Sequence, residues 1–358
     1  MRIAFLYGAQ FLGGRPIDFT NVWDSPRGLT GSEISWLMFA KEMHRRGHDV
    51  GLHVWDPADT KEWESIPLNR VRQLADVVYA WISPDLLTAV PKDALRVVNQ
   101  QLNDWNYCHP GWDRYVDVIT SPSRSHMVHM RTRTPADMSK WETLPNGCDP
   151  SQYSGEKVPG RVVYASCASR GLHLLLERWP EVKERVPEAH LRIFYNVQGW
   201  IDTVLECRPD EHQVARAHYI RDVLPKLRAY GVELVGSTSR RRMAREFSEA
   251  MVLAYPCDPV VFTEGFSVTT MEACASGTVP VISSADSLGQ IYEGLPMVPA
   301  PPSKHMGDFV DHVVRGLTNP AWRAAVTSTA RELASRHAWP VLAELLESIL
   351  AKRLAERG

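Results

Sequence analysis

Two carboxylates with seven residues between them, Glu264 and Glu272, have the types and the spacing to do chemistry together. The apolar residues after Glu264 repeat with a helical period, which places Glu264 just before a helix and Glu272 about one turn inside it. The N-terminus of a helix binds anions because its first N–H groups have no helical acceptor, and here those groups belong to Gly265, Phe266, Ser267 and Val268. An anion held there would lie between two acceptors of hydroxyl hydrogen bonds. This arrangement suits a sugar nucleotide, whose diphosphate has a sugar on one side and a ribose on the other.

The elements that must position this pair form a parallel α/β unit. Residues 251–255 are a short apolar run that ends at Pro256, which predicts a buried strand. The helical pattern starts near residue 267 and ends at Gly277, a typical stop. Residues 279–282 predict a second buried strand, so the order is strand, loop, helix, strand.

On spacing alone, a plainer interpretation is favoured, in which Glu264 is a partner of the helix dipole and Glu272 is a solvated helix residue. The surrounding residues change this. Together they resemble the E-x7-E signature of retaining glycosyltransferases of the GT-B fold, in the family usually called family four: Tyr255-Pro256, Glu264-Gly265-Phe266, Glu272-Ala273, Ala275-Ser276-Gly277 and Val279-Pro280-Val281. The resemblance implies that Glu264 meets the donor sugar, that Glu272 meets the ribose hydroxyls, and that the diphosphate lies on the amides between them.

Composition and charge exclude several other classes of protein. The 358 residues suffice for about two domains, and 44% hydrophobic with 23% charged residues is ordinary for a globular chain. A net charge of −2 does not indicate nucleic-acid binding, and six scattered cysteines without a C-x-x-C pair indicate neither zinc nor a disulfide framework. The N-terminus lacks a signal-peptide pattern and no apolar run approaches a membrane span, so we expect a cytoplasmic protein.

The N-terminal region opens with a predicted strand over residues 3–7 and a helix that begins at Gly31, Ser32 and Glu33. The resemblance implies that the Gly-containing loop over residues 28–32 lies by the donor phosphate, where glycine lets the backbone approach closely. The alternative is a plain helix start with Ser32 as N-cap.

Polar residues follow the predicted strand over residues 95–102, at the end of a parallel strand where open α/β sheets place ligands. Many members of the resembled family carry His-Asp here, whereas this chain has Asn103 and Asp104. Because Asn cannot exchange a proton, an acid or base role there is in doubt, while Asp104 could orient an acceptor hydroxyl. His109 could also contact the acceptor, although a lone histidine is more often structural.

A short basic helix is predicted after residues 121–123. His126 and His129 on it have the spacing of a metal pair, but no third ligand stands out, and we expect no metal. We interpret the helix as a solvated face. Contact with an anionic membrane surface or a phosphorylated acceptor stays open as an alternative.

In the second half, a strand over residues 161–165 leads to Arg170 and Gly171 at the start of a helix. This pair resembles the Lys-Gly pair of the family, and a second phosphate-binding cation of the family is missing. A cation at a helix start is unfavourable without an anionic partner, and arginine can bind phosphate through two hydrogen bonds. Arg170 is therefore expected to neutralise the departing diphosphate.

The remaining pattern completes two domains and a C-terminal helix. We predict one long helix over residues 211–230 and interpret the arginines at 240–242 as solvated. We place an N-terminal acceptor-side domain at 1–155, a nucleotide-sugar-binding domain at 156–338, and at 339–358 a helix that packs back on the first domain, as the resemblance implies.

We therefore expect two Rossmann-like domains facing a cleft, in the GT-B fold. The implied reaction is transfer of a sugar from a nucleotide-diphosphate sugar to a hydroxyl with retention of configuration, without a metal or other cofactor. Glu264, Asp104 and Arg170 are the expected catalytic residues. A non-catalytic nucleotide-sugar-binding protein stays open, as does a GT-B enzyme of another reaction type, an epimerase or a non-glycosidic coupling enzyme. The sequence does not determine the base, the sugar, the acceptor or the oligomeric state.

Overall fold

The computed structural model describes residues 1–8, 23–25, 29–53, 75–106, 108–134 and 136–357, and these form two compact units. The first unit contains residues 1–22, 29–147 and 337–358, and the second contains residues 23–28 and 148–336. The divisions at 147/148 and 336/337 lie eight and two residues from the predicted boundaries at 155/156 and 338/339. No helix in the described part of the chain is long and apolar enough to span a membrane.

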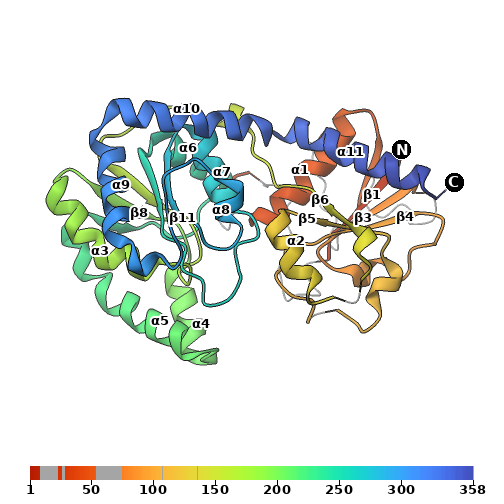
Figure 1. Ribbon diagram of the computed structural model, residues 1–358, viewed down its shortest axis with the longest axis horizontal. Helices are drawn as coiled ribbons and strands as arrows, with labels where there is room; N and C mark the ends of the chain where they lie inside the picture. The colour runs from red at the N-terminus through yellow and green to blue at the C-terminus, as the bar shows by residue number, and fades with distance from the viewer. Residues whose placement is uncertain (9–22, 26–28, 54–74, 107, 135, 358) are drawn as a thin grey trace. The chain divides into compact units, whose positions relative to one another are not determined.

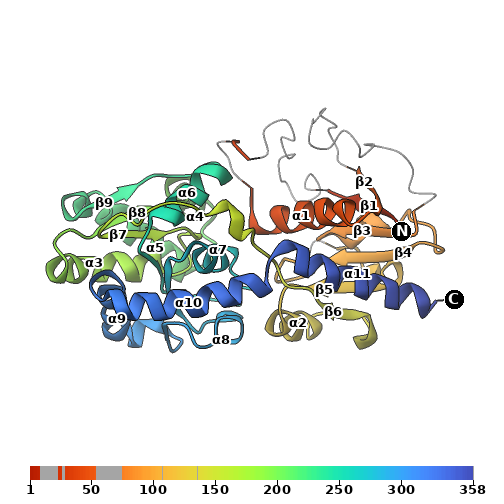
Figure 2. The same cartoon turned by 90° about the horizontal axis from the view of Figure 1, so that it is seen from above.

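The first unit is built on a parallel sheet with strand order β2-β1-β3-β4-β5-β6. Figure 1 labels all of these strands except β2, which is labelled in Figure 2. Strands β3 and β4 are buried at every position, as expected for central strands of a parallel sheet covered on both faces. The strands are β1 (Arg2–Leu6), β2 (Asp49–His53), β3 (Val77–Trp81), β4 (Leu95–Asn99), β5 (Val118–Ser121) and β6 (Trp141–Thr143). The helices are α1 (Gly31–Arg45), α2 (Arg124–Arg131) and α11 (Trp339–Ala355), with short 3-10 turns η3 (Pro84–Leu87), η4 (Trp112–Tyr115) and η5 (Met138–Lys140).

Helix α1 begins at Gly31 because Thr30 caps it. The Glu33 N–H donates to Thr30 Oγ1 at 3.3 Å, and the Thr30 N–H donates to Glu33 Oε2 at 2.7 Å, which is a capping box. The alternative that Ser32 is the N-cap is therefore wrong. Glu33 also accepts a hydrogen bond from Tyr7 at 2.7 Å, so the cap is tied to the chain just after β1.

The second unit has its own parallel sheet, in the order β12-β11-β10-β7-β8-β9. Strands β8 and β11 of this sheet are labelled in Figure 1. Its strands are β7 (Arg161–Tyr164), β8 (His190–Ile193), β9 (Val232–Leu234), β10 (Val252–Tyr255), β11 (Val279–Ser283) and β12 (Met297–Val298). Its helices are α3 (Leu172–Arg185), α4 (Val197–Cys207), α5 (Glu211–Val223), α6 (Arg240–Glu249), α7 (Val268–Ser276), α8 (Leu288–Ile291), α9 (Met306–Thr318) and α10 (Pro320–Arg336), with 3-10 turns η6 (Pro150–Gln152), η7 (Lys226–Tyr230) and η8 (Pro302–Lys304). Strand β10 pairs with both β7 and β11, so the loops after these strands leave the same edge.

The single helix predicted over residues 211–230 is wrong. Helix α5 ends at Val223, and Lys226–Tyr230 forms the separate 3-10 turn η7. Pro225 lies at the break, where its missing N–H and its ring disfavour a continuous α-helix. Helices α4 and α8 and strands β6 and β12 were not predicted from the residue pattern.

The C-terminal helix α11 returns to the first unit and lies alongside α1 (Figure 2). Trp339 at its start is 3% exposed, and its ring meets Phe39 of α1 edge-on with centroids 5.5 Å apart. Farther along, Glu347 accepts hydrogen bonds from Arg46 Nε at 2.8 Å and from His48 Nε2 at 2.9 Å. The predicted return of the last helix to the first domain is thus present.

Trp339→Ala should lower the free energy of unfolding of the first unit by about 3–5 kcal/mol, because it removes a buried indole and leaves a cavity beside Phe39. Val341→Ala, on the same helix at 46% exposure, is the matched control and should change it by less than about 1 kcal/mol. Urea unfolding of both variants measures this. Equal effects of the two substitutions would show that the α1–α11 contact does not stabilise the unit.

Candidate functional site

The predicted strand, loop, helix, strand unit is present as β10, α7 and β11. Ser267 is the N-cap of α7, and its hydroxyl accepts from the Thr270 N–H at 3.2 Å. Of the four residues predicted to supply the N–H groups of the helix start, only Val268 lies in the first turn, because the helix begins one residue after Ser267 and Gly265 and Phe266 precede it. The Val268 and Thr269 N–H groups are the ones that no helical carbonyl precedes. Gly277 closes the helix with φ of 69°, a left-handed conformation that favours glycine.

The other end of α7 is held by the largely buried amine of Lys157, whose pKa is lowered by burial to about 7. Lys157 Nζ donates to the carbonyl oxygens of Phe247 at 3.2 Å and Ser276 at 3.1 Å, and to Thr278 Oγ1 at 3.0 Å. Phe247 and Ser276 lie in the last turns of α6 and α7, where carbonyls lack helical donors and a positive charge is favourable. Lys157 therefore sets the position of α7 against α6.

Glu264 is 7% exposed and is held through one of its two carboxylate oxygens. Oε2 accepts from the Tyr255 hydroxyl at 2.6 Å and from Arg170 Nη1 at 3.0 Å. Oε1 accepts no hydrogen bond from the described residues. Burial raises the pKa of Glu264, while Arg170 and Tyr255 counteract that rise.

The backbone of Glu264 is held by the loop after β11. Asp286 Oδ2 accepts from the N–H groups of both Thr263 and Glu264 at 2.8 Å, and the Ser287 N–H donates to the Glu264 carbonyl at 3.2 Å. Asp286 itself has φ of 53°, an unfavourable backbone conformation for a residue with a side chain. The loop after β11 therefore holds the backbone of Glu264 through Asp286, a residue in a strained backbone conformation.

Arg170 lies beside Glu264, as well as at the start of α3. Its Nη2 donates to the Thr263 carbonyl at 3.1 Å, so the guanidinium spans the residue pair Thr263–Glu264. Gly171 follows with φ of 93°, and a Cβ there would lie 1.8 Å from the Pro256 carbonyl oxygen. Only glycine fits at this approach, which brings the Arg170 loop onto the end of β10.

Arg216 of α5 ties the same two loops together from the outside. Its Nη1 donates to the carbonyls of Ser169 at 2.8 Å and Asp258 at 2.7 Å, and its Nη2 donates to Asp258 Oδ2 at 2.7 Å. Ser169 directly precedes Arg170. Nothing in the sequence pattern singled out Arg216, because its partners come from two distant loops.

Glu272 is 4% exposed and forms an ion pair with Arg240, the first residue of α6. The interpretation of Glu272 as a solvated helix residue is therefore wrong. So is the interpretation of all three arginines at 240–242 as solvated, since the Arg240 side chain is only 16% exposed. The sequence offered no signal that distinguishes Arg240 from its two neighbours.

The other predicted site residues belong to the first unit. Asp104 follows β4, and its Oδ1 accepts from the Asn106 N–H at 3.0 Å, closing a local turn. His109 is exposed, and its Nδ1 lies 2.8 Å from Asp85 Oδ2. Gly31 and Ser32 form the first turn of α1, and Gly28 of the predicted loop lies outside the described residues.

The two histidines of α2 bind the loop after β4 through its backbone. His126 is fully buried; its Nε2 donates to the Leu102 carbonyl at 2.9 Å and its Nδ1 accepts from Ser121 at 2.7 Å. His129 Nε2 donates to the Asn103 carbonyl at 3.1 Å. Both rings therefore position Asn103. In the described part of the chain, no three His, Cys, Asp or Glu side chains gather as a metal site.

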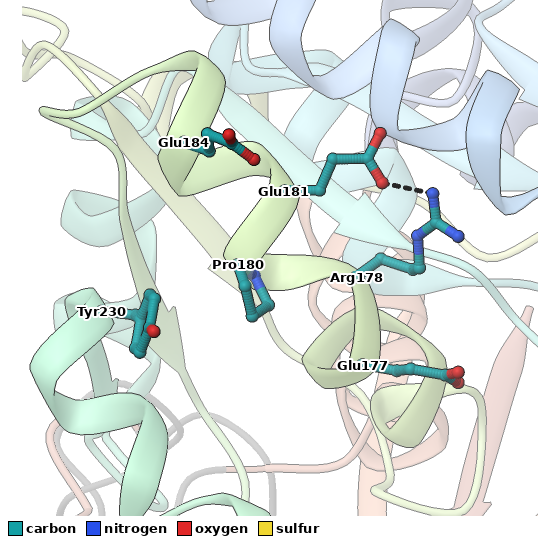
Figure 3. Close-up of a pocket in the computed structure, with 6 residues that line it drawn as sticks. All are labelled: Glu177, Arg178, Pro180, Glu181, Glu184 and Tyr230. Atoms are coloured by element: carbon teal, nitrogen blue, oxygen red, sulfur yellow. Dashed lines mark hydrogen bonds and ion pairs between the residues drawn. The ribbon is translucent and has the colours of Figure 1, made fainter.

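A hollow is lined by residues of α3 and η7 (Figure 3). It is lined by Glu177, Arg178, Pro180, Glu181, Glu184 and Tyr230. Its α3 residues begin five positions after the first residue of that helix, or about 8 Å along the axis. Arg178 in it pairs with Glu181 (Figure 3).

Neither models of known protein families nor curated protein sequences match this chain. Solved structures do. A sucrose-phosphate synthase from Thermosynechococcus elongatus superposes with a TM-score of 0.68 at 14% identity, over 99% of this chain and 100% of that one. AviGT4, a glycosyltransferase involved in avilamycin A biosynthesis, gives 0.67 at 16% identity over 99% and 98%. Anabaena HepE in complex with UDP and glucose gives 0.64 at 16% identity over 98% and 100%. At these identities the likeness shows the fold, and it confirms the predicted GT-B fold.

The stability of the first unit should depend on pH through His126. Burial lowers the pKa of His126 to about 4, below its ordinary value of 6.5, so the unfolded chain binds more protons between these values. The stability from the neutral ring is complete above pH 6.5 and is lost as the pH falls toward 4. Lowering the pH from 7.5 to 5 should therefore decrease the free energy of unfolding by about 2 kcal/mol through His126.

His126→Asn should remove this component, so that the variant loses about 2 kcal/mol less than the wild type between the two pH values. Urea unfolding at pH 7.5 and pH 5 measures the difference. His218→Asn, on the exposed surface of α5, is the control and should retain the wild-type dependence. If His126→Asn also retained it, the ring would not be held neutral.

Proposed function

We propose that this protein is a glycosyltransferase that moves a sugar from a nucleotide-diphosphate sugar to an acceptor hydroxyl, with retention of configuration and without a metal. The observation that carries the proposal is the buried Glu264 carboxylate, one oxygen of which accepts no hydrogen bond from the described residues, next to Arg170 and the start of α7, on a GT-B fold. HepE, which shares this fold, is solved with UDP and glucose.

The donor is proposed to bind along the start of α7. Its diphosphate would accept hydrogen bonds from the first-turn N–H groups of Val268 and Thr269, because the free N–H groups at a helix N-terminus bind anions. Glu272 would accept from the ribose hydroxyls, sharing its charge between them and Arg240. Glu264 Oε1 would accept from a hydroxyl of the sugar, since Oε2 is already occupied.

In the reaction, the bond between the anomeric carbon and the diphosphate oxygen breaks while the acceptor oxygen bonds to the same carbon from the same face. The acceptor proton passes to the leaving diphosphate oxygen, so no protein base is required. Arg170 and the helix amides stabilise the charge on the leaving group, and the Glu264 carboxylate favours the positive anomeric centre. Asp104 of the first unit is proposed to orient the acceptor hydroxyl, with Asn103 and His109 as further acceptor contacts and Gly31 and Ser32 as phosphate neighbours.

A non-catalytic nucleotide-sugar-binding protein is the second candidate, favoured by Asn103 in place of the usual His and by the missing second cation. A GT-B epimerase or non-glycosidic coupling enzyme is the third. Thermal shifts with UDP, GDP, ADP and dTDP identify the nucleotide, because a ligand of the native state raises the unfolding temperature. Hydrolysis of the matching nucleotide sugars then tests catalysis, and the anomeric configuration of a transfer product tests retention. Binding without turnover would favour the second candidate.

Glu264→Gln should lower sugar transfer by about two orders of magnitude and leave the affinity for UDP nearly intact, because it removes the charge that faces the anomeric carbon and keeps the shape. Initial rates with UDP-sugars and calorimetric titration with UDP measure the two effects. Parallel losses of affinity and transfer would instead show that Glu264 supports the loop.

Glu272→Gln should do the opposite and weaken UDP binding by about 1–3 kcal/mol, because a charged acceptor of the ribose hydroxyls is lost. Glu293→Gln, an exposed residue of the same unit, is the control and should bind UDP as the wild type does. Unchanged affinity in Glu272→Gln would remove this residue from the nucleotide site.

A further inference from the structure

Tyr255 lies directly behind the carboxylate of Glu264. It is the last residue of β10, is 0% exposed, and pairs in register with Ile282 of β11. Its ring meets Tyr164 of β7 edge-on, with centroids 6.0 Å apart and planes at 77°. A tyrosine packed in this way between two strands has little freedom to turn, so its hydroxyl is a fixed point in the sheet.

The hydroxyl donates to Glu264 Oε2 at 2.6 Å, which is the shorter of the two hydrogen bonds on that oxygen. Burial raises the pKa of Tyr255 well above its ordinary value, so the phenol keeps its proton and remains a donor. Hydrogen bonds from neutral donors to a carboxylate are strong and directional because the acceptor is charged. The bond therefore orients the carboxylate and also favours its ionised form.

The two oxygens of Glu264 are consequently in different situations. Oε2 receives Tyr255 and Arg170, whereas Oε1 receives no donor from the described residues, although the side chain is more than nine-tenths buried. Oε1 is not sealed from solvent, so a ligand hydroxyl can reach it and donate to it. Tyr255 donates to Oε2 of Glu264, whereas Arg170 also donates to the Thr263 carbonyl and is proposed to act on the leaving diphosphate.

We propose that Tyr255 is the positioning residue of Glu264: its hydroxyl holds Oε2 so that Oε1 faces the ligand and accepts from a sugar hydroxyl. This inference rests on the proposed function for the identity of the ligand. Tyr255 does not touch the reacting atoms, and it acts through Glu264.

The test is a titration of Glu264 that needs no ligand. In the full-length protein with ¹³C-labelled glutamate carboxyls, the Glu264 signal is identified by its loss in Glu264→Gln. The charged and titratable groups around it are Arg170, Tyr255 and Asp286, together with Cys257 and Tyr292, and all but Tyr255 are unchanged in Tyr255→Phe. Loss of one hydrogen bond to the carboxylate should raise the pKa of Glu264 by about one to two units.

The same variant separates positioning from packing. With UDP-glucose as the probe, Tyr255→Phe should lower kcat about tenfold, move the acid limb of the pH profile to higher pH by the same interval as the titration, and leave UDP affinity unchanged. Tyr79→Phe, an equally buried tyrosine of β3 in the first unit, is the matched control and should change neither the titration nor the profile.

The outcomes are distinct. An unchanged pKa of Glu264 in Tyr255→Phe overturns the proposal, and so does a shifted pKa with an unshifted pH profile of turnover. If wild-type protein neither binds UDP nor turns over any nucleotide sugar, the proposed function fails, and the titration alone still decides whether Tyr255 controls Glu264. If Tyr255→Phe does not fold, 3-fluorotyrosine at position 255 replaces it. Its more acidic phenol is a stronger donor and should lower the pKa of Glu264, and an unchanged pKa would again contradict the proposal.

Discussion

The buried carboxylate of Glu264 is the constraint around which the second unit is arranged. A charge removed from water is costly unless it is paired and hydrogen-bonded, and breaking such a pair costs more than the pair contributes. Arg170 supplies the counter-charge, Tyr255 a hydroxyl, and Asp286 accepts from the backbone N–H of Glu264. These partners come from the loop after β7, from β10 itself and from the loop after β11. A GT-B sheet that orders these strands as β11-β10-β7 brings them to one edge.

Three residues outside the carboxylate pair fix the loops and the helix around Glu264. Gly171 lets the Arg170 loop come against the Pro256 carbonyl, which no residue with a Cβ could do. Arg216 then joins Ser169 to Asp258 across the same approach. Lys157 holds the far end of α7, so that both the start of that helix and Glu272 within it have defined positions. A rigid shell of this kind is what a site needs if it is to stabilise a developing charge without reorganising.

At the proposed nucleotide site, the carboxylate of Glu272 already has a charged partner, Arg240. A carboxylate that already has a cation can still accept from neutral hydroxyls through its remaining lone pairs. A ribose is such a ligand. Glu264 and Glu272 are thus both buried carboxylates with an arginine partner, which the regular spacing of the motif did not reveal.

The order of strands and helices around the Glu264–Glu272 pair depends on short-range sequence features and could therefore be predicted from the sequence. Apolar runs ending at Pro256, the helical period after Glu264 and the glycine at 277 each act within a few residues, so the β10–α7–β11 unit was predicted correctly. The GT-B fold was expected from a resemblance of the residues around this pair to a glycosyltransferase signature, and the solved structures confirm the fold. The break at Pro225 is also a local signal, and it was overlooked in a segment that otherwise reads as helical. What only the tertiary structure decided are contacts across long sequence distances: Arg240 with Glu272, Arg216 with the two loops, and Tyr255 and Arg170 on the same oxygen of Glu264. An arginine in a run of three has the same local sequence whether it faces water or a buried carboxylate, and only the folded chain brings its partner within reach.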